Sequence, residues 1–251
     1  MPETEHTGNL ERDSRKGWFA STQWNVVLAA GGLSAEQRAA ALEQLCRTYW
    51  YPLYAYIRRR GNNPLDAQDL TQEFFARLLE KQWLEGVEKN GSRFRSFLLS
   101  AVNAFLANEY DRATAAKRGG PRQPISLDTN APEDRYGLEP ATNETPERLF
   151  DRRWALTVLE RALMRLQDET AAAGKSRHFE VLNPFLSCEP EPGEYAAAAA
   201  QLGVSTGAVA VSVHRLRQRY RDLVRVEIGE TVADPAQIDI EMSELFAALR
   251  G

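Results

Sequence analysis

The sequence has few cysteines and no long hydrophobic run, and each shortage excludes a class of protein. Only two cysteines, Cys46 and Cys188, occur in 251 residues, so a disulfide framework and a zinc site both lack their ligands. No apolar run reaches the roughly 18 residues of a membrane span, and the first residues are too polar for a signal peptide. We expect a cytoplasmic protein without a membrane segment, metal or cofactor.

Basic residues are fewer than acidic residues, and the net charge is −4. Charge is nevertheless segmented. Residues 93–122 hold six basic and two acidic residues, whereas residues 226–251 hold six acidic residues and one arginine. A basic segment of this kind can follow phosphates even in an acidic protein. A glycine-rich phosphate loop and a nucleophile–base pattern are both missing, so we do not expect an enzyme.

Helical spacing of apolar residues recurs along the chain, while alternating strand patterns are missing. The sequence therefore predicts an all-α fold of two helical domains. Five prolines between residues 121 and 146 predict a flexible linker between them. The predicted parts are an N-terminal extension (1–33), a helical domain (34–118), the linker (119–146), a second helical domain (147–229) and an acidic amphipathic helix (230–251).

A helix with an acidic face is predicted after residue 63. Asn63 is a candidate N-cap, and Pro64 suits the first helical position. Asp66, Asp69 and Glu73 then fall on one face. Acidic faces are usually only solvated, but this density of carboxylates predicts a docking surface for a basic partner.

The next predicted helix follows Ser92, a candidate N-cap, and has an aromatic core face that begins at Phe94. Its opposite face carries Asn103 and Tyr110 and is followed by basic residues. Small polar groups, an aromatic ring and nearby cations can approach a nucleic acid closely. A solvated helix face remains the alternative.

Residues 194–225 predict a helix-turn-helix. Ala199, Gly203 and Val209 have the spacing that such a unit needs, and Ser205 can cap the second helix. Small residues at the start of that helix suit entry into a DNA groove, and the arginines that follow suit phosphates. The alternative is a helical packing unit that binds no DNA.

Three strings in order resemble the bacterial RNA polymerase sigma factors, in particular the extracytoplasmic-function (ECF) group. They are DAQDLTQEFFARLL, FRSFLLSAVNAFLANEYDRA and YAAAAAQLGVSTGAVAVSVHRLRQR. The chain is similar to a variant of that group with N- and C-terminal extensions. It departs from the family pattern at Asn103-Ala104, where an Arg-Asn pair is usual, and at Ala197, where glutamate is common.

The resemblance implies that core RNA polymerase and promoter DNA are the partners; an anti-sigma factor or other regulator is left open. It implies that the first domain docks on polymerase and melts DNA, that the helix-turn-helix reads the upstream duplex, and that no catalytic residue is needed. The implied polymerase-binding residues are Asp66, Asp69, Gln72 and Glu73. The implied DNA-binding residues are Arg95, Asn103, Asn108, Tyr110, Lys117, Arg118, Ser205, Thr206, Ala210, His214, Arg215, Arg217 and Arg219.

Two other functions stay open at this point. A helix-turn-helix regulator could act without core polymerase, and a helical scaffold would keep its function after charge reversal of Arg215 and Arg219. For the acidic C-terminal helix we favour packing on the C-terminal domain. The alternative hypothesis is autoregulation, in which this helix covers a basic surface until it is displaced.

Overall fold

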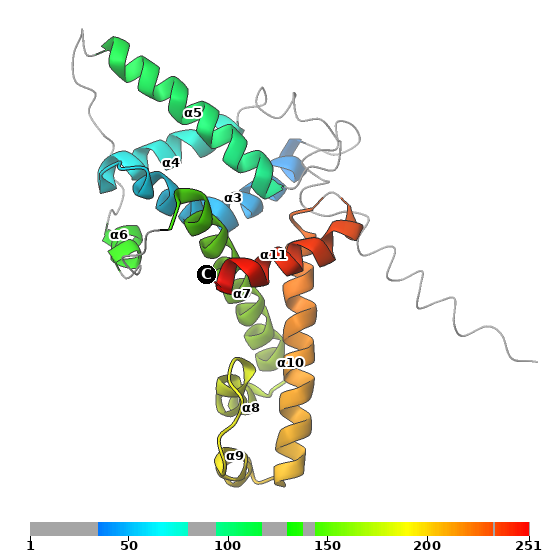
Figure 1. Cartoon of the computed structure of the whole chain (residues 1–251). Helices are drawn as coiled ribbons and strands as arrows, with labels where there is room; N and C mark the ends of the chain where they lie inside the picture. The colour runs from blue at the N-terminus through cyan, green and yellow to red at the C-terminus, as the bar shows by residue number, and fades with distance from the viewer. Residues whose placement is uncertain (1–34, 80–93, 117–129, 138–143, 233, 251) are drawn as a thin grey trace, which may run out of the picture. The chain divides into compact units, whose positions relative to one another are not determined.

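A computed structural model describes residues 35–79, 94–116, 130–137, 144–232 and 234–250 of the chain (Figure 1). Every regular element in these ranges is a helix, and none is a strand. The predicted all-α fold is therefore confirmed. The helices form two compact units: residues up to Ala155 together with those from Gly229 onward make unit 1, and Leu156–Ile228 make unit 2.

Unit 1 contains most of the helices. They are α3 (Ala35–Arg59), α4 (Pro64–Leu79), α5 (Phe94–Ala116), α6 (Asn130–Gly137), the start of α7 (Pro146–Ala172), and α11 (Ile238–Arg250) after a short 3-10 turn, η3 (Pro235–Gln237). Aromatic side chains from different helices fill its core. Phe74 of α4 meets Phe105 of α5 with ring centroids 5.6 Å apart, and Tyr49 of α3 meets Phe94 at 5.1 Å. All four rings are fully buried, as the aromatic face predicted for α5 requires.

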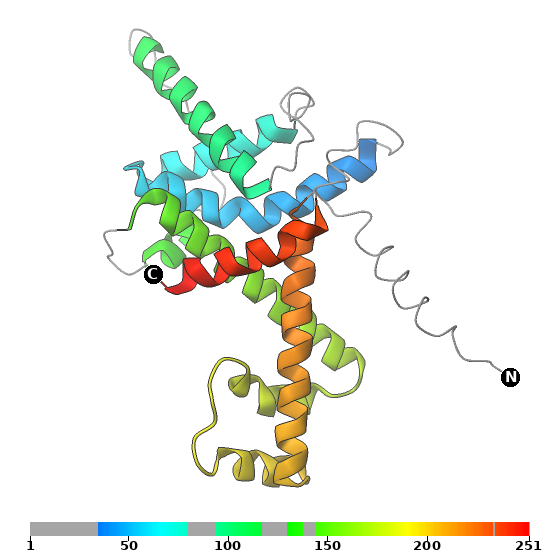
Figure 2. The ribbon, with the colours of Figure 1, turned by 45° about the vertical axis from the view of Figure 1, so that its right-hand side comes forward.

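The acidic C-terminal helix belongs to unit 1. Ile238, Met242 and Leu245 of α11 are buried, and α11 runs beside α3 in both views (Figures 1 and 2). The expected packing on the C-terminal domain is therefore wrong, although the helix itself is where the sequence places it. The reason is that α11 carries an apolar face with a buried glutamate, Glu241, whose partner is on α5.

The predicted flexible linker also differs from the structure. Residues 130–137 form α6, in which Pro132 falls in the first turn, where proline is tolerated. The Glu133 carboxylate accepts two hydrogen bonds from Arg58 of α3, at 2.8 and 3.0 Å, and one from the Tyr54 hydroxyl at 2.6 Å. The remaining linker residues before 144, and the N-terminal extension, lie outside the described residues.

The predicted domain boundary at residue 146 falls at the start of α7, which continues without a break for 27 residues. The Thr145 hydroxyl accepts a hydrogen bond from the Arg148 backbone N–H at 3.3 Å, so this point is a helix start. The division between the units instead lies between Ala155 and Leu156, inside α7. The sequence pattern at residues 145–146 therefore marks the start of a helix and not a boundary between the two units, because α7 contributes residues to both.

Unit 2 is the rest of α7 with α8 (Ser176–Leu182), η2 (Asn183–Leu186), α9 (Glu194–Leu202) and α10 (Thr206–Gly229). Its small core joins α8 and η2 to the α9–α10 pair through Phe185, Ala199, Val209 and Val213. Figure 2 shows α9 meeting the start of α10 at the lower end of the picture. No single helix of the described residues is long and apolar enough to cross a membrane; α9 and α10 together have the length and composition, but they are bent by 97°.

Candidate functional site

The cap predicted for α4 is present and positions its acidic face. The Asn63 side-chain oxygen accepts a hydrogen bond from the Asp66 backbone N–H at 2.9 Å, and Pro64 is the first residue of the helix. The four residues implied to bind polymerase then line one cleft of about 1510 Å³ between α4 and α5. They are Asp66, Asp69, Gln72 and Glu73.

This cleft, here called the α4–α5 groove, is strongly acidic. Arg60 is the one cation among the described residues that line it, although Arg77, outside the lining, pairs with two of the lining carboxylates, Glu73 and Glu109. The acidic lining residues are Asp66, Asp69, Glu73, Glu109, Asp111 and Glu147. Because like charges repel, such a surface favours a basic polypeptide and disfavours phosphates.

The opposite wall of the groove comes from α5 and holds two of the implied DNA-binding residues. Asn103 and Tyr110 both line it, and Tyr110 is 74% exposed. Asn108 is exposed but is not part of the lining. The structure therefore brings together residues that the resemblance assigns to two different partners. Lys117 and Arg118 lie outside the described residues.

A contact that the sequence did not reveal fixes Asn103. Its side-chain oxygen accepts hydrogen bonds from the Arg60 guanidinium and, at 2.8 Å, from the Tyr56 hydroxyl of α3. Tyr56 also lies 3.1 Å from a carboxylate oxygen of Glu147. Arg60 is the residue directly after the end of α3. Nothing local in the sequence indicates a partner 43 residues away.

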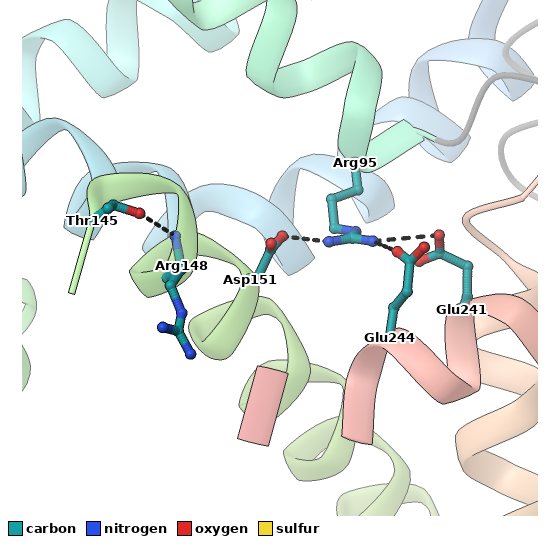
Figure 3. Close-up of polar contacts among 6 residues, drawn as sticks. All are labelled: Arg95, Thr145, Arg148, Asp151, Glu241 and Glu244. Atoms are coloured by element: carbon teal, nitrogen blue, oxygen red, sulfur yellow. Dashed lines mark hydrogen bonds and ion pairs between the residues drawn. The ribbon is translucent and has the colours of Figure 1, made fainter. Parts of the chain in front are cut away.

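Arg95 is not at a DNA-binding surface in this structure. It is 8% exposed, and its guanidinium lies 4.5 Å from the ring centroid of the buried Trp154. Figure 3 shows it between Asp151 of α7 on one side and Glu241 and Glu244 of α11 on the other, with ion pairs to all three. The expected DNA contact of Arg95 is therefore corrected: the acidic face of α11 and Asp151 hold this side chain inside unit 1.

The Arg95 cluster contains more carboxylates than cations. Burial raises the pKa of Asp151 above its ordinary value, and the nearby Arg95 only partly opposes this shift. The pKa of Arg95 is itself raised: burial lowers it, and the carboxylates, Glu241 first, outweigh burial. The cluster is an ion network in which Arg95 and Glu241 are buried and Asp151 and Glu244 are partly exposed.

In unit 2 the α9–α10 turn has the geometry that its sequence predicts. Gly203 adopts a left-handed conformation with φ of 67° and ends α9. The Ser205 hydroxyl accepts a hydrogen bond from the Ala208 backbone N–H at 3.2 Å, which caps α10. Two helices at 97° joined by this short turn present the start of α10 to its surroundings.

The predicted DNA-binding residues of α10 divide into two groups. The first group is exposed and consists of Ser205, Thr206, Ala210, His214 and Arg215; Arg219 of the second group is exposed as well. The other group makes internal contacts: Arg217 donates to the backbone carbonyls of Phe185 and Cys188, at 2.8 and 2.6 Å, and Arg219 pairs with Glu169 at 2.7 Å. That hydrogen-bonded Arg219 lowers the pKa of Glu169. Arg217 is therefore a structural residue here, because its donors satisfy carbonyls at the end of η2.

The described fold and surfaces define an all-α protein with an acidic groove in one unit and a two-helix turn with an exposed helix start in the other. No family model and no solved structure matches the chain. The chain is similar to the ECF RNA polymerase sigma factor SigE of Mycolicibacterium smegmatis: they are 27% identical over 227 residues, which are 89% of this chain and 77% of that protein. This similarity supports the ECF sigma factor family, and it confirms the resemblance that the three sequence strings indicate.

Proposed function

We propose that the chain is a sigma factor that directs core RNA polymerase to specific promoters and initiates transcription. The observation that carries this proposal is the similarity to an ECF sigma factor over 89% of the chain. An alignment of that extent includes residues of both units. The proposed function needs no covalent chemistry from this chain, and it places the protein in the cytoplasm with polymerase and promoter DNA as partners.

We assign polymerase docking to the α4 wall of the groove. Asp66 is exposed and Asp69 is partly exposed, so their carboxylates can meet basic side chains, whereas the Glu73 carboxylate already pairs with Arg77. Gln72 lies between them and can donate or accept a hydrogen bond. The excess of carboxylates over cations in the groove supports a basic partner for this surface.

Capture of the melted strand is assigned to the α5 wall. Asn103 and Tyr110 are exposed on that wall, Asn108 is exposed on α5 outside the groove lining, and an exposed tyrosine can stack on an unpaired base. Lys117 and Arg118, which follow in sequence, would supply phosphate contacts. Strand opening is then driven by binding unstacked bases.

For α9 and α10 we propose a helix-turn-helix that reads the upstream duplex. Ser205, Thr206 and Ala210 are small and exposed, so the start of α10 can come close to the bases in a DNA groove. His214 and Arg215 follow one turn later. His214 and Arg215 have no hydrogen bond or ion pair with any described residue, so their donors are available. Arg219 could reach a phosphate only by giving up Glu169.

The test is transcription in vitro by core polymerase with and without the full chain, followed by mapping of start sites. We expect new start sites that share an upstream and a downstream sequence element. Arg215→Glu should abolish them, whereas Arg112→Glu, an exposed arginine of α5 that lines no part of the groove, should not. A duplex gel shift by the chain alone, without any polymerase-dependent transcript, would favour the alternative of a regulator that acts without polymerase.

A further inference from the structure

The side-chain oxygen of Asn103 is fully occupied within unit 1. A carbonyl oxygen has two lone pairs, and here Arg60 donates to one and Tyr56 to the other, since the Tyr56 hydroxyl is nearer to Asn103, at 2.8 Å, than to Glu147, at 3.1 Å. Tyr56 lies in α3 and Arg60 directly follows it, and the last turn of α3 is held by Arg58, which pairs with Glu133 at 2.8 Å.

The chemistry of arginine fixes which way the Asn103 amide points. A guanidinium has donors but no acceptor, so the amide oxygen has to face Arg60 and the amide nitrogen has to face away. That nitrogen donates to none of the described residues. Asn103 is exposed and lines the α4–α5 groove, so this side chain offers the groove two N–H donors and no acceptor.

The surroundings of this amide favour a base over a phosphate. Carboxylates dominate the groove lining, and they repel a phosphate that approaches Asn103. Tyr110 lies seven residues further along α5 on the same face, with the small Ala107 between them. An uncharged base that stacks on Tyr110 can bring the acceptors of its edge to the Asn103 amide.

We propose that Arg60 and Tyr56 are positioning residues that hold the Asn103 amide in one orientation, so that the groove selects an acceptor edge of an unpaired DNA base and discriminates against adenine. The proposal rests on the proposed sigma factor function. Asparagine binds adenine with both its oxygen and its nitrogen, and the oxygen is taken here. An edge with adjacent acceptors, such as O6 and N7 of guanine, is compatible with the free N–H groups.

The test uses the full chain bound to core polymerase. The complex selects single-stranded DNA from a pool of random oligonucleotides, and the bound strands are sequenced. The wild-type complex should show one position at which adenine is disfavoured relative to guanine by about fivefold or more. Arg60→Met, alone and with Tyr56→Phe, should raise adenine at that position only, because the amide oxygen is released.

Two controls separate positioning from charge and from folding. Arg60→Lys keeps a donor without an acceptor and should retain the wild-type preference. Arg59→Met removes the same charge one residue away, outside the groove lining, and should also retain it. Each variant is first shown to bind polymerase as the wild type does, and Arg60→Met alone leaves the buried Tyr56 in place.

The outcomes distinguish this proposal from the proposed function. If the wild-type complex selects a sequence but its adenine discrimination is the same in Arg60→Met and in the double variant, the positioning role is wrong and the sigma factor function stands. Asn103→Asp, which removes both N–H donors, must also lose the preference, or the role of the amide is wrong. If the complex selects no sequence at all, strand capture by this groove fails together with the positioning role.

Discussion

At the scale of single residues, the burial of Arg95 shows that this side chain stabilises the fold of unit 1. Its partners Asp151, Glu241 and Glu244 are 56, 146 and 149 residues away in the chain. Glu241 is 1% exposed, and Arg95 is one of the residues that compensate its charge. Removing one member of a buried ion network costs far more than removing an exposed pair, because the remaining charge stays buried.

We expect Arg95→Met to lower the free energy of unfolding of unit 1 by about 3–5 kcal/mol. The measurement is urea unfolding of the full chain followed by tryptophan fluorescence, since Trp154 packs against Arg95. The control is Arg112→Met, which removes an exposed arginine whose ion pair is with Glu109 at 2.8 Å, and which should change stability by less than about 0.5 kcal/mol. Equal effects of the two substitutions would show that the Arg95 network is not buried in solution.

Asp151→Asn should stabilise the chain at neutral pH. Burial raises the pKa of Asp151 in the folded state, so ionisation of this carboxyl disfavours folding, and its cost is present above the folded pKa. Below about pH 4 the carboxyl is protonated in both states, and the difference from wild type should vanish. Thermal unfolding from pH 3 to 8 measures this, with Asp168→Asn at an exposed site as control. Lower stability of Asp151→Asn at pH 7 would mean that the ion pair with Arg95 outweighs burial.

Local and distant partners explain which residues the sequence could predict. The caps at Asn63 and Ser205 were predicted correctly because a cap bonds to a backbone N–H three residues away. Arg95 was misplaced, and the contact of Arg60 with Asn103 was missed, because these partners come from other helices. The sequence predicts that a side chain is cationic, but only the tertiary fold determines whether a carboxylate neutralises it.

At the scale of elements, the turn between α9 and α10 depends on one backbone conformation. Gly203 has φ of 67°, which costs other residues about 1–2 kcal/mol. Gly207, four residues on, is in the first turn of α10 in an ordinary helical conformation, and an added Cβ would meet nothing within 4 Å. The two glycines therefore form a matched pair for substitution by alanine.

Gly203→Ala should destabilise the α9–α10 pair by about 1–2 kcal/mol, whereas Gly207→Ala should be neutral or stabilising by up to about 1 kcal/mol, because alanine is the better helix former. Hydrogen exchange of the α9 and α10 amides in the full chain reports both effects. If Gly203→Ala leaves amide protection unchanged, the turn does not need the left-handed conformation.

The sequence identified most helices but not which core they join. Apolar spacing correctly predicted the buried face of α5 and the apolar face of α11, since the period of a helix is a local property. It did not place α11 in unit 1 or α6 against α3. Those contacts depend on single long-range pairs, such as Glu133 with Arg58, which periodicity does not contain.

At the scale of the whole molecule, the acidic groove in unit 1 has consequences for both proposed partners. Its carboxylates should attract polymerase and repel free DNA, and both effects weaken as salt screens the charges. Binding of a basic polymerase surface would neutralise the groove and favour entry of a DNA strand. The groove would in this way make strand binding depend on polymerase.

Neutralising the groove should therefore have opposite effects on the two partners. We expect Asp66→Asn with Asp69→Asn to weaken polymerase binding and to strengthen binding of a single-stranded oligonucleotide by the free chain, by about threefold at low salt. Fluorescence anisotropy measures both affinities. The control pair, Asp168→Asn with Glu189→Gln, removes two exposed charges from unit 2 and should leave polymerase binding unchanged. If the double variant bound both polymerase and the oligonucleotide more weakly, the groove carboxylates would not act on the two partners in opposite directions, and the electrostatic argument would be wrong.

Sedimentation of the labelled full chain with purified core RNA polymerase at moderate salt tests the central claim most directly. The account predicts that the chain moves with the polymerase as one complex, and that Asp66→Lys with Asp69→Lys returns it to the slow, free boundary. A wild-type chain that sediments apart from the polymerase at every concentration would contradict the assignment as a sigma factor.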